Sequence, residues 1–431
     1  MRGYLTNIGM DRDSDRVVHS KLVVGLVVDN EFDNDPRVNR MVSILLDEGY
    51  SVSVLCYGYM GRQYQERDKI VVRRITVLRR LIDILFFFEN LIPLFDLFWS
   101  YHIRKFILSD RIDVLHVNDL YLSRPAHMAV AQMRVKPVFI LDLHENFPVA
   151  VLSYNWTKGF PRKHLSLPGR WSSKEERYLS YPDYIITLSE YYADQLSGKF
   201  NFTEEKRIVV LPNYPDLDEL EGDGQDQPEV QVSKKDFLFL YFGAVGERRG
   251  IFTLIDAVSD LNIEGVSCQL LIIGPVDKAD QKRFSDCINR KGMRDLIVHI
   301  PWTDVSRLPY YLGISDAGVA PFVVNEQHDS GIANKLFQYM YGGLPVIVSS
   351  CAAQKEMVEK YSSGYVYDSY NELKLVMKKL IEEREAGMEM GARGREAVIK
   401  NLNMTSGSLQ VKSLYRDIAS RLTSADGSKQ G

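Results

Sequence analysis

The sequence predicts an α/β protein built from two doubly wound domains with a cleft between them. Near-continuous apolar runs of strand length alternate with amphipathic helical patterns, which is typical of a parallel sheet covered by helices on both faces. The chain of 431 residues is too long for one ordinary core, and its 45% of hydrophobic residues suffices for two. The alternation stops once, in an acidic stretch rich in glycine near the middle of the chain, and then restarts.

The first domain is predicted over residues 21–213. Residues 1–20 are polar, lack the apolar core of a signal peptide and are interpreted as a flexible arm. The domain opens with the apolar run LVVGLVVD, and the amphipathic segment PRVNRMVSILLDEG follows. Further buried strands are expected at Ser51–Cys56, Asp113–Val117, Val138–Asp142 and Tyr184–Leu188.

One segment of the first domain is unusually apolar, since residues 81–103 read LIDILFFFENLIPLFDLFWSYHI. Three acidic residues and Pro93 interrupt it, so it is a poor candidate for a membrane-spanning helix, which needs about 20 predominantly apolar residues. Two interpretations stay open: a pair of helices packed in the core, or an interfacial patch with basic flanks that contacts a membrane surface. The second interpretation predicts that Phe87, Phe88 and Trp99 hold the protein on anionic membranes.

The second domain is predicted over residues 237–402. It follows a linker at residues 214–236, which include the acidic stretch DLDELEGDGQDQPEVQVSKKD. Residues 403–424 are expected to form a last helix that packs back on the first domain, and residues 425–431 a polar tail. Strands of the second domain are expected at Phe237–Phe242, Gln269–Ile273, Ile297–Ile300, Ala317–Ala320 and Leu344–Val348.

Charge and cysteine content narrow the class of function. The chain has 53 basic and 57 acidic residues, so its net charge of −4 gives no electrostatic footprint for nucleic acid. The four cysteines lie far apart and predict reduced, buried thiols of a cytoplasmic protein. The D-x-D pairs Asp13/Asp15 and Asp216/Asp218 lie in polar segments away from strand ends, and no His/Cys cluster has zinc spacing. We therefore expect no metal site.

Features that favour an anion gather where strands of the second domain end. The stretch FGAVGERRG places Arg248 and Arg249 between a strand and a helix, and free N–H groups at a helix start bind anions. The stretch LIIGP ends the next strand with Gly274. In ANKLFQYMYGG, Lys335 falls in the first turn of a helix, where a cation is unfavourable unless an anion is bound there. These stretches predict a phosphate site in the cleft.

Candidate polar residues of the first domain also follow strands. The stretch LDLHENF places His144 just after a strand, and histidine is the side chain best suited to proton transfer near neutral pH. His116 and Asn118, at the end of DVLHVND, are weaker candidates, and Arg37 or Arg40 lies near the cleft after the first strand. For each of these residues a purely structural role stays open at this point.

Taken together, these stretches resemble the family-4 retaining glycosyltransferases of the GT-B fold, over residues 21–401. The matching stretches are DPRVNR, DVLHVND, ILDLHENFP, YPDYIITLSE, VVLPNYPDLD, YFGAVGERRG, LLIIGP, SDAGVAPF and NKLFQYMYGGLPVI. The resemblance implies two Rossmann-like domains, of which the first binds the acceptor and the second the nucleotide-sugar donor. It implies no cofactor besides that donor.

The resemblance also implies roles for single residues, with His144 near the donor sugar as the catalytic residue. The implied donor-binding residues are Arg249, Lys335 and Gly243 for the phosphates and Gln338, Ser330, Asn334 and Gly274 for the nucleotide and sugar. Ser330 and Gln338 stand where similar enzymes carry two glutamates, and Ala244 stands where they carry an arginine. Asp329 or Glu326 could replace the first glutamate by a local shift.

The activity implied by the resemblance is transfer of a sugar from a nucleotide-sugar to a hydroxyl group with retention of configuration. The implied acceptor is a glycan or a lipid-linked glycan of bacterial surface polysaccharide synthesis, reached in the cytoplasm at the inner face of the membrane. Because both glutamates are replaced, a non-catalytic partner subunit that binds nucleotide is one alternative. A nucleotide-sugar 2-epimerase of the same fold is the enzymatic alternative.

Overall fold

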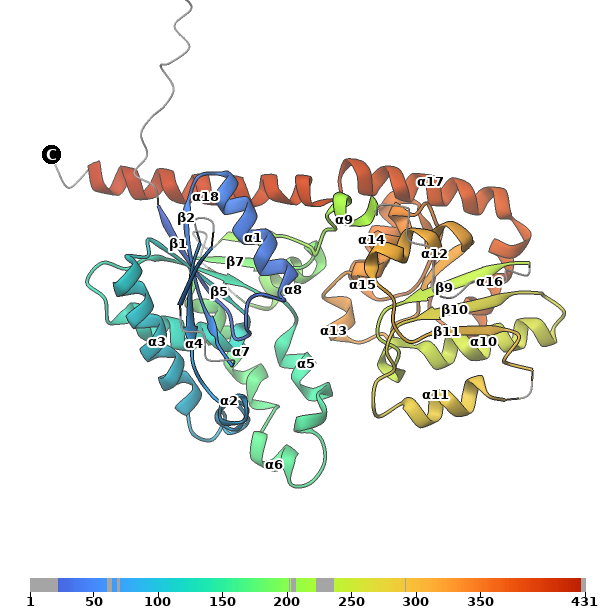
Figure 1. Cartoon of the computed structure of the whole chain (residues 1–431), viewed down its shortest axis with the longest axis horizontal. Helices are drawn as coiled ribbons and strands as arrows, with labels where there is room; N and C mark the ends of the chain where they lie inside the picture. Colours follow the sequence, from blue (N-terminus) through green and yellow to red (C-terminus); the bar gives the residue numbers. More distant parts are fainter. Residues whose placement is uncertain are drawn as a thin grey trace, which may run out of the picture.

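The computed structural model describes residues 22–59, 64–67, 70–200, 202, 207–221, 236–290 and 292–427. The predicted arm at 1–20, the pair Asp13/Asp15, most of the predicted linker and residues 428–431 lie outside the described residues. Figure 1 shows two α/β units side by side, with a long last helix that returns from the second unit across the first.

The first unit is built on a sheet of eight strands in the order β3-β4-β2-β1-β5-β6-β7-β8, in which β3 alone is antiparallel to its neighbour among the paired strands described. The strands are β1 Val23–Val27, β2 Ser51–Tyr57, β3 Tyr64–Arg67, β4 Ile70–Ile75, β5 Val114–Asn118, β6 Val138–Asp142, β7 Tyr184–Thr187 and β8 Arg207–Val210. The helices are α1 Pro36–Asp47, α2 Arg79–Phe87, α3 Leu94–Asp110, α4 Ser123–Ala131, α5 Phe147–Ser153, α6 Arg162–Ser166, α7 Arg170–Ser180 and α8 Glu190–Lys199.

The second unit is built on a parallel sheet of six strands in the order β11-β10-β9-β12-β13-β14. The strands are β9 Leu238–Phe242, β10 Gln269–Ile273, β11 Ile297–Ile300, β12 Ala317–Ala320, β13 Val346–Ser349 and β14 Gly364–Tyr367. The helices are α9 Leu217–Glu221, α10 Ile251–Ile263, α11 Gln281–Ile288, α12 Leu308–Ile314, α13 Glu326–Asp329, α14 Asn334–Tyr341, α15 Ala352–Tyr361, α16 Tyr370–Glu382 and α17 Arg384–Lys400.

Both sheets are doubly wound because their strands are apolar on both faces. In β1, Val24 and Leu26 pack in one hydrophobic cluster, whereas Val27 packs in the cluster on the opposite face. The second sheet is likewise buried between two clusters. The strand order reverses between β1 and β5 and between β9 and β12, and ligands of such sheets bind beyond the carboxyl ends of strands at this point. The fold class predicted from the sequence is confirmed.

The last helix, α18 (Met404–Gly427), completes the first unit although it follows the second in sequence. Its side chains Val411, Leu414, Tyr415 and Ile418 lie in the core cluster that also holds residues of β1 and α1. The Tyr415 hydroxyl lies 2.7 Å from Nδ1 of His116, a fully buried side chain of β5. His116 therefore has a structural role in binding α18, and it is not among the described residues that line the cleft.

The apolar segment at residues 81–103 forms α2, a turn and the first part of α3. Its inner side is core, since Phe95 and Ile103 are buried. Trp99 is also fully buried and donates a hydrogen bond of 2.8 Å from Nε1 to the Tyr57 hydroxyl, so the prediction that it contacts a membrane is wrong. Among the helices described, none combines the length and hydropathy required to cross a membrane.

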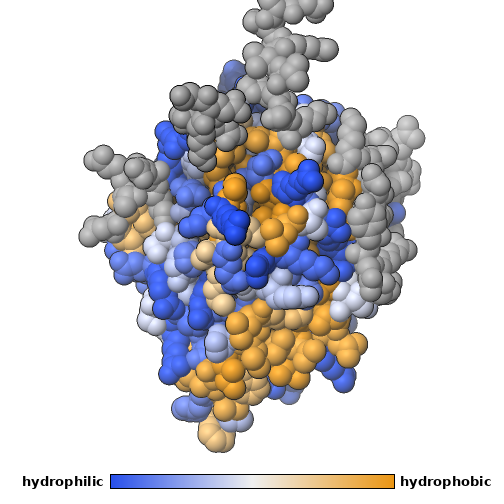
Figure 2. Space-filling view, turned by 90° about the vertical axis from the view of Figure 1, so that its left-hand side faces the viewer, coloured by the Kyte–Doolittle hydropathy of each residue, from blue (hydrophilic) through white to orange (hydrophobic). Residues whose placement is uncertain are grey.

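The outer side of the same segment exposes apolar side chains to solvent. In the lower part of the face turned to the viewer in Figure 2, hydrophobic residues form a continuous area. We define the apolar face as the exposed side chains of Leu81, Ile84, Leu91, Ile92, Leu94, Leu97 and Tyr101. The core interpretation thus holds for the inner side of the segment, whereas a membrane contact of the exposed outer side stays a prediction.

The four cysteines are buried free thiols, as predicted. Within the described ranges, no group of three or more His, Cys, Asp or Glu side chains is arranged to hold a metal ion. Asp216 instead begins a short helix, where its Oδ1 accepts a hydrogen bond of 3.1 Å from the backbone N–H of Asp218. The spacing of that D-x-D pair thus has a local explanation.

Candidate functional site

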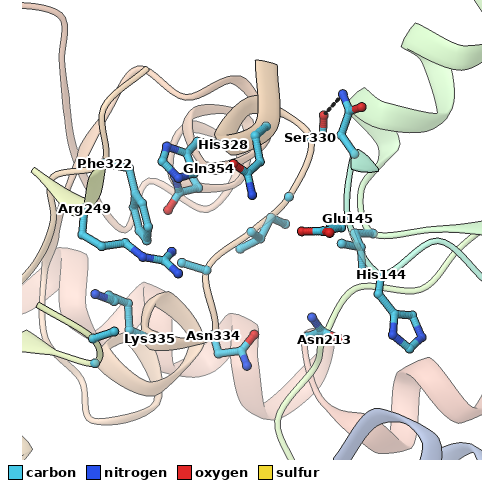
Figure 3. Close-up of a pocket in the computed structure, with 18 of the residues that line it drawn as sticks. His144, Glu145, Asn213, Arg249, Phe322, His328, Ser330, Asn334, Lys335 and Gln354 are labelled. Carbon is cyan, nitrogen blue, oxygen red and sulfur yellow. Dashed lines mark hydrogen bonds between the residues drawn. The ribbon is translucent and has the colours of Figure 1, made fainter. Parts of the chain in front are cut away.

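A cavity of about 500 Å³ lies between the two units, where strand ends of both sheets face each other. In Figure 3, Arg249 and Lys335 of the second unit extend into it from one side, and His144 and Glu145 of the first unit lie opposite. The structure brings together seven of the eight residues to which the resemblance gives catalytic or donor-binding roles, namely His144, Gly243, Arg249, Ser330, Asn334, Lys335 and Gln338.

The two glycines predicted at the site differ in their relation to the cavity. Gly243 follows β9 with φ +116° and lies against the end of the Lys335 side chain, which a Cβ on Gly243 would meet at 3.5 Å. Gly274 does not line the cavity among its described residues. It ends β10 with φ +144°, and a Cβ there would lie 2.1 Å from the carbonyl oxygen of Gly243. Gly274 therefore permits the close approach that positions Gly243.

Lys335 is a buried cation that has no counter-ion among the described residues. Its side chain is 7% exposed, and Nζ has no hydrogen-bond partner among the described residues. The ammonium lies 3.6 Å from the ring centroid of Tyr241 and 5.2 Å from that of Phe322. Burial and the nearby charge of Arg249 lower the pKa of Lys335 well below its ordinary value. An anion in the cavity would supply the missing partner.

Arg249 lies beside Lys335 at the end of the short helix Glu247–Arg249. Its guanidinium lies 5.0 Å from the ring centroid of Phe322, and Nε has no hydrogen-bond partner within the described residues. Burial and the neighbouring Arg248 lower the pKa of Arg249. Arg248 itself is not among the described lining residues and lies 3.7 Å from Asp277. Of the two arginines considered from the sequence, the structure therefore places Arg249 at the cavity.

The start of α14 adds backbone donors to this side of the cavity. Its N-cap residue is Ala333, whose side chain makes no capping hydrogen bond, so the first N–H groups of the helix are not capped by that residue. Asn334 is exposed at the first helical position, and Gln338 is half-buried one turn further along the same side. All three residues line the cavity together with Lys335.

Ser330 lines the cavity, but its hydroxyl is already bonded within the protein. It donates to the carbonyl oxygen of Glu326 at 2.6 Å and accepts from Nδ2 of Asn146 at 3.1 Å. The carbonyl oxygen of Ser330 also accepts a hydrogen bond of 2.8 Å from the hydroxyl of Ser189. Since Asn146 and Ser189 belong to the first unit, Ser330 connects the two units across the cavity (Figure 3).

The carboxylates considered as replacements for the first glutamate do not line the cavity. Oδ1 of Asp329 accepts a hydrogen bond of 2.9 Å from the backbone N–H of Ala352, so Asp329 stabilises the start of α15. Glu326 is exposed at the start of α13. Among the described residues that line the cavity, Glu145 of the first unit is the only carboxylate. The local shift suggested from the sequence is therefore wrong.

His144 is held by polar residues at the ends of β5 and β6. Its Nε2 lies 3.0 Å from Oδ1 of Asn118 and 3.6 Å from Oδ2 of Asp142, and its Nδ1 lies 3.8 Å from Oδ2 of Asp119. Burial alone would lower the pKa of His144, but the carboxylates of Asp119 and Asp142 raise it above its ordinary value. The imidazole is thus stabilised as a proton donor that faces the cavity.

A pair of half-buried acidic residues, Asp29 and Asp119, lies next to His144. The Tyr121 hydroxyl lies 2.8 Å from Oδ2 of Asp29 and 3.2 Å from Oδ2 of Asp119. Burial raises the pKa of Asp119 to about 7 and also raises that of Asp29, although His144 opposes both shifts. Asp119 has φ +73°, a left-handed conformation that is strained for a residue other than glycine. The carboxyl group of Asp119 therefore titrates near neutral pH beside the cavity, and the pKa of Asp29 lies above its ordinary value.

Arg37 lies behind the cavity and does not line it. Its Nε and Nη2 donate to the two carboxylate oxygens of Asp142 at 3.0 and 2.7 Å, and its Nη1 donates to the carbonyl of Leu211 and to Oδ1 of Asn213. Burial alone would raise the pKa of Asp142, but Arg37 and two imidazoles hold it well below its usual range. Arg40 likewise contacts the segment that leads from β8 to the second unit, because its Nη1 donates a hydrogen bond to the carbonyl oxygen of Tyr214.

Sequence reasoning missed several residues around the cavity. Glu145 directly follows His144, and its carboxylate accepts a short hydrogen bond from the Tyr154 hydroxyl. Gln354 lies in the first turn of α15, and Phe322 follows β12. The stretch SDAGVAPF was noted as a whole, and its position at a strand end could have indicated Phe322. No spacing signal in the sequence indicates Gln354.

Comparison with known proteins gives two family profiles that together match most of the chain. The profile described as Glycosyltransferase Family 4 matches residues 37–219, and the profile described as Glycosyl transferases group 1 matches residues 223–397. A curated relative, spore coat protein SA of Bacillus subtilis, is 21% identical over 246 residues, which are 54% of this chain. The chain spans 64% of the length of that relative.

Solved structures of similar fold cover nearly the whole chain. Sucrose-phosphate synthase of Thermosynechococcus elongatus has a TM-score of 0.72 at 17% identity, and the match covers 93% of this chain and all of that one. An Anabaena protein solved in complex with UDP and glucose has a TM-score of 0.62 at 14% identity, with 92% of this chain and all of that one covered.

Proposed function

The chain belongs to glycosyltransferase family 4, and on this premise we propose that it transfers a sugar from a nucleotide-sugar donor to an acceptor hydroxyl with retention of configuration. The observation that carries the proposal is the pair of a half-buried Arg249 and a buried Lys335 beside one cavity between two doubly wound units, each with a nitrogen atom that has no hydrogen-bond partner among the described residues. A diphosphate fits this pair in charge, and the open start of α14 favours an anion at the same place. In the proposed arrangement the second unit binds the donor and the first unit binds the acceptor.

In the proposed reaction, the bond between the anomeric carbon and the diphosphate oxygen breaks while the acceptor oxygen bonds to that carbon. The proton of the acceptor hydroxyl passes to the departing diphosphate. Negative charge develops on the diphosphate, where Arg249, Lys335 and the first N–H groups of α14 stabilise it more strongly than in the ground state. Gly243 lets the backbone approach the phosphates, and Asn334 and Gln338 bind the nucleoside side of the donor.

His144 acts from the opposite side of the cavity as a hydrogen-bond donor to the sugar. The carboxylates of Asp119 and Asp142 raise its pKa and so favour the protonated imidazole, which is suited to donate a hydrogen bond to a sugar or acceptor oxygen. Asn118 fixes the ring by its 3.0 Å contact to Nε2. Because Nε2 contacts Asn118, Nδ1 is the ring nitrogen left to face the substrate. The proton that it donates is its own or one that it shares with the carboxyl group of Asp119.

The first test measures ligand binding and turnover. Among UDP, GDP, ADP and dTDP, one diphosphate is expected to stabilise the protein, and a ligand at 100 times its Kd raises the free energy of unfolding by about 2.7 kcal/mol. The matching nucleotide-sugar is then expected to release its diphosphate faster when an acceptor is present. Absence of thermal stabilisation by all four diphosphates contradicts the proposed donor site.

One observation favours a second candidate, a partner subunit that binds nucleotide without turnover. Similar enzymes carry two glutamates where this chain has Ser330 and Gln338, and the hydroxyl of Ser330 is bonded to Asn146 and Glu326. The two candidates differ in turnover, since a partner subunit binds the diphosphate but never consumes the nucleotide-sugar. An epimerase differs from both because it consumes the donor without an acceptor.

We further propose that the apolar face is a membrane contact and that the acceptor is a lipid-linked glycan of bacterial surface polysaccharide synthesis. Exposed basic residues flank the apolar face at both ends, with Arg79 and Arg80 before it and Arg104 and Lys105 after it. Apolar side chains with basic flanks match the interior and the anionic surface of a bilayer. Attachment on the cytoplasmic side would bring a lipid-linked acceptor to the first unit.

Replacement of Leu91, Ile92 and Leu97 by Ser is expected to weaken binding to vesicles of equal parts phosphatidylglycerol and phosphatidylcholine by about 100-fold. Each side chain is about half exposed, so its burial in the bilayer contributes roughly 1 kcal/mol. Diphosphate binding is expected to stay unchanged, and vesicle sedimentation at low and high salt measures the effect. Here Trp99, a core residue, is left unaltered.

A matched control replaces three exposed apolar residues of the second unit, Ile263, Leu375 and Met388, by Ser. This variant removes a similar apolar surface at a distance from the apolar face and is expected to bind vesicles like the unaltered protein. If the unaltered protein ignores the vesicles at low salt, the apolar face is no membrane contact.

A further inference from the structure

A buried glutamine lines the cavity with its amide oxygen unpaired. Gln354 is 1% exposed, and its Oε1 has no hydrogen-bond partner among the described residues. The side chain lies on the boundary of the cavity that also holds Arg249 and Lys335. We propose that Gln354 binds a hydroxyl group of the donor sugar and so contributes to the choice of that sugar. This inference rests on the proposed function and assigns it a further residue.

The side chain of Gln354 interacts with the Cys351 thiol, but its amide oxygen does not use the backbone partner that its position in the helix offers. Gln354 occupies the third position of α15, where a glutamine commonly turns back to accept a hydrogen bond from the N-cap backbone N–H. Here the helix start is stabilised from outside, because Asp329 accepts from the N–H of Ala352 at 2.9 Å. The amide of Gln354 is therefore left toward the cavity and not toward its own backbone.

A buried amide oxygen without a partner lowers the stability of the protein, because it gives up its hydrogen bond to water without a replacement. A leucine or methionine of similar volume at this position would avoid that loss. A ligand with a hydrogen-bond donor in the cavity compensates this loss. The same reasoning applies to Lys335, whose unpaired ammonium indicates an anionic ligand.

The position of Gln354 indicates which part of the donor it meets. Figure 3 shows it between the cations Arg249 and Lys335 on one side and Glu145 and His144 on the other. A sugar joined to a diphosphate at the cations and directed toward His144 would lie beneath the amide. A neutral amide both accepts and donates hydrogen bonds and so fits an uncharged hydroxyl group. The ligand class is therefore a nucleotide-sugar with a free hydroxyl at this position.

The test compares two ligands and two glutamines of the same cavity. The ligands are the diphosphate selected from UDP, GDP, ADP and dTDP, and the glucose conjugate of that nucleotide. Gln354→Met is expected to bind the diphosphate as the unaltered protein does but the conjugate about 5- to 150-fold more weakly, because a sugar hydroxyl is left unpaired in a buried site. Gln338→Met is expected to weaken the binding of both ligands by the same factor, since the proposed contact of Gln338 is to the nucleoside that both ligands share.

The melting temperature without ligand distinguishes the proposed role of Gln354 from a structural role, which predicts that substitution lowers it. Gln354→Met, with Gln354→Leu as a second variant, is expected to melt at the same or a higher temperature than the unaltered protein. If both variants melt at a lower temperature, or if they lose affinity for the diphosphate and for its glucose conjugate by the same factor, Gln354 is a structural residue and the inference is overturned. If no diphosphate binds the unaltered protein, the proposed donor site itself fails.

Discussion

Lys335→Ala and Arg249→Ala are each expected to weaken binding of the nucleoside diphosphate by about 10- to 150-fold. A charge-assisted contact to a phosphate contributes roughly 1.5–3 kcal/mol, and both cations have nitrogen atoms without a hydrogen-bond partner among the described residues. The nucleoside without phosphate is expected to bind both variants like the unaltered protein. Isothermal titration calorimetry with both ligands measures the difference.

The control for this prediction is Lys355→Ala, which removes a lysine of α15 that is about half exposed and pairs with Glu359 on the surface. A surface pair of this kind contributes little, so diphosphate affinity is expected to stay within about twofold. Lys335→Met is expected to leave the unliganded protein at least as stable, because it removes an unpaired buried charge. A Lys335 variant that loses stability but keeps full diphosphate affinity would contradict the proposed site.

Diphosphate binding is also expected to take up protons. Burial and Arg249 lower the pKa of Lys335, so in the free protein this lysine loses its proton at lower pH than in the unfolded chain. A bound anion raises that pKa again, and affinity therefore falls as pH rises through the window between the lowered and the ordinary value. Titrations in buffers of different ionisation enthalpy measure the uptake, which is expected to disappear in Lys335→Met.

Arg37→Leu is expected to lower the free energy of unfolding by about 3–5 kcal/mol. The substitution removes both hydrogen bonds from the guanidinium to Asp142 and leaves a carboxylate buried without its main partner. The segment that leads from β8 to the second unit also loses the hydrogen bonds of Arg37 to Leu211 and Asn213. Denaturant unfolding at neutral pH measures the loss.

The pH dependence of this loss identifies its cause. The pKa of Asp142 is held well below its usual range, so the pair stabilises the fold above the ordinary pKa of aspartate, about 3.9, and this stabilisation is lost as pH falls through the lowered value. The difference between Arg37→Leu and the unaltered protein is therefore expected to shrink in acid. The double variant Arg37→Leu, Asp142→Leu is expected to recover much of the loss, and equal stability of both variants would contradict this account.

Strands with continuous apolar runs could be predicted from the sequence, and strands without them could not. The runs at β1, β2, β5, β6, β7 and β9 to β13 were recognised because both faces of these strands are buried. In β4, Arg73 and Arg74 interrupt the pattern, yet Arg74 is buried and its guanidinium contacts Asp33 at 2.9 Å. Its partner lies far away in sequence, so the burial of this arginine could not be read from a local pattern.

The candidate site was predictable where a residue follows a strand or opens a helix. His144, Arg249 and Lys335 were found in this way, because strand ends and helix starts of doubly wound sheets face the same cleft. The hydrogen-bond partners of each side chain in the folded protein were not predictable. Ser330 is bonded across the two units to residues that are distant in sequence, and the amide oxygen of Gln354 has no hydrogen-bond partner among the described residues.

The return of α18 to the first unit sets the order in which the chain can complete its folding during translation. Residues of the first sheet leave the ribosome first, and amino-terminal units usually fold first during synthesis. Here the core of that sheet is completed by four side chains of α18, namely Val411, Leu414, Tyr415 and Ile418. The nascent first unit therefore exposes the apolar side chains that α18 will cover until the whole second unit has been translated. Chaperones that bind apolar surface can reach this face in the interval. The unit that is made first is thus completed last.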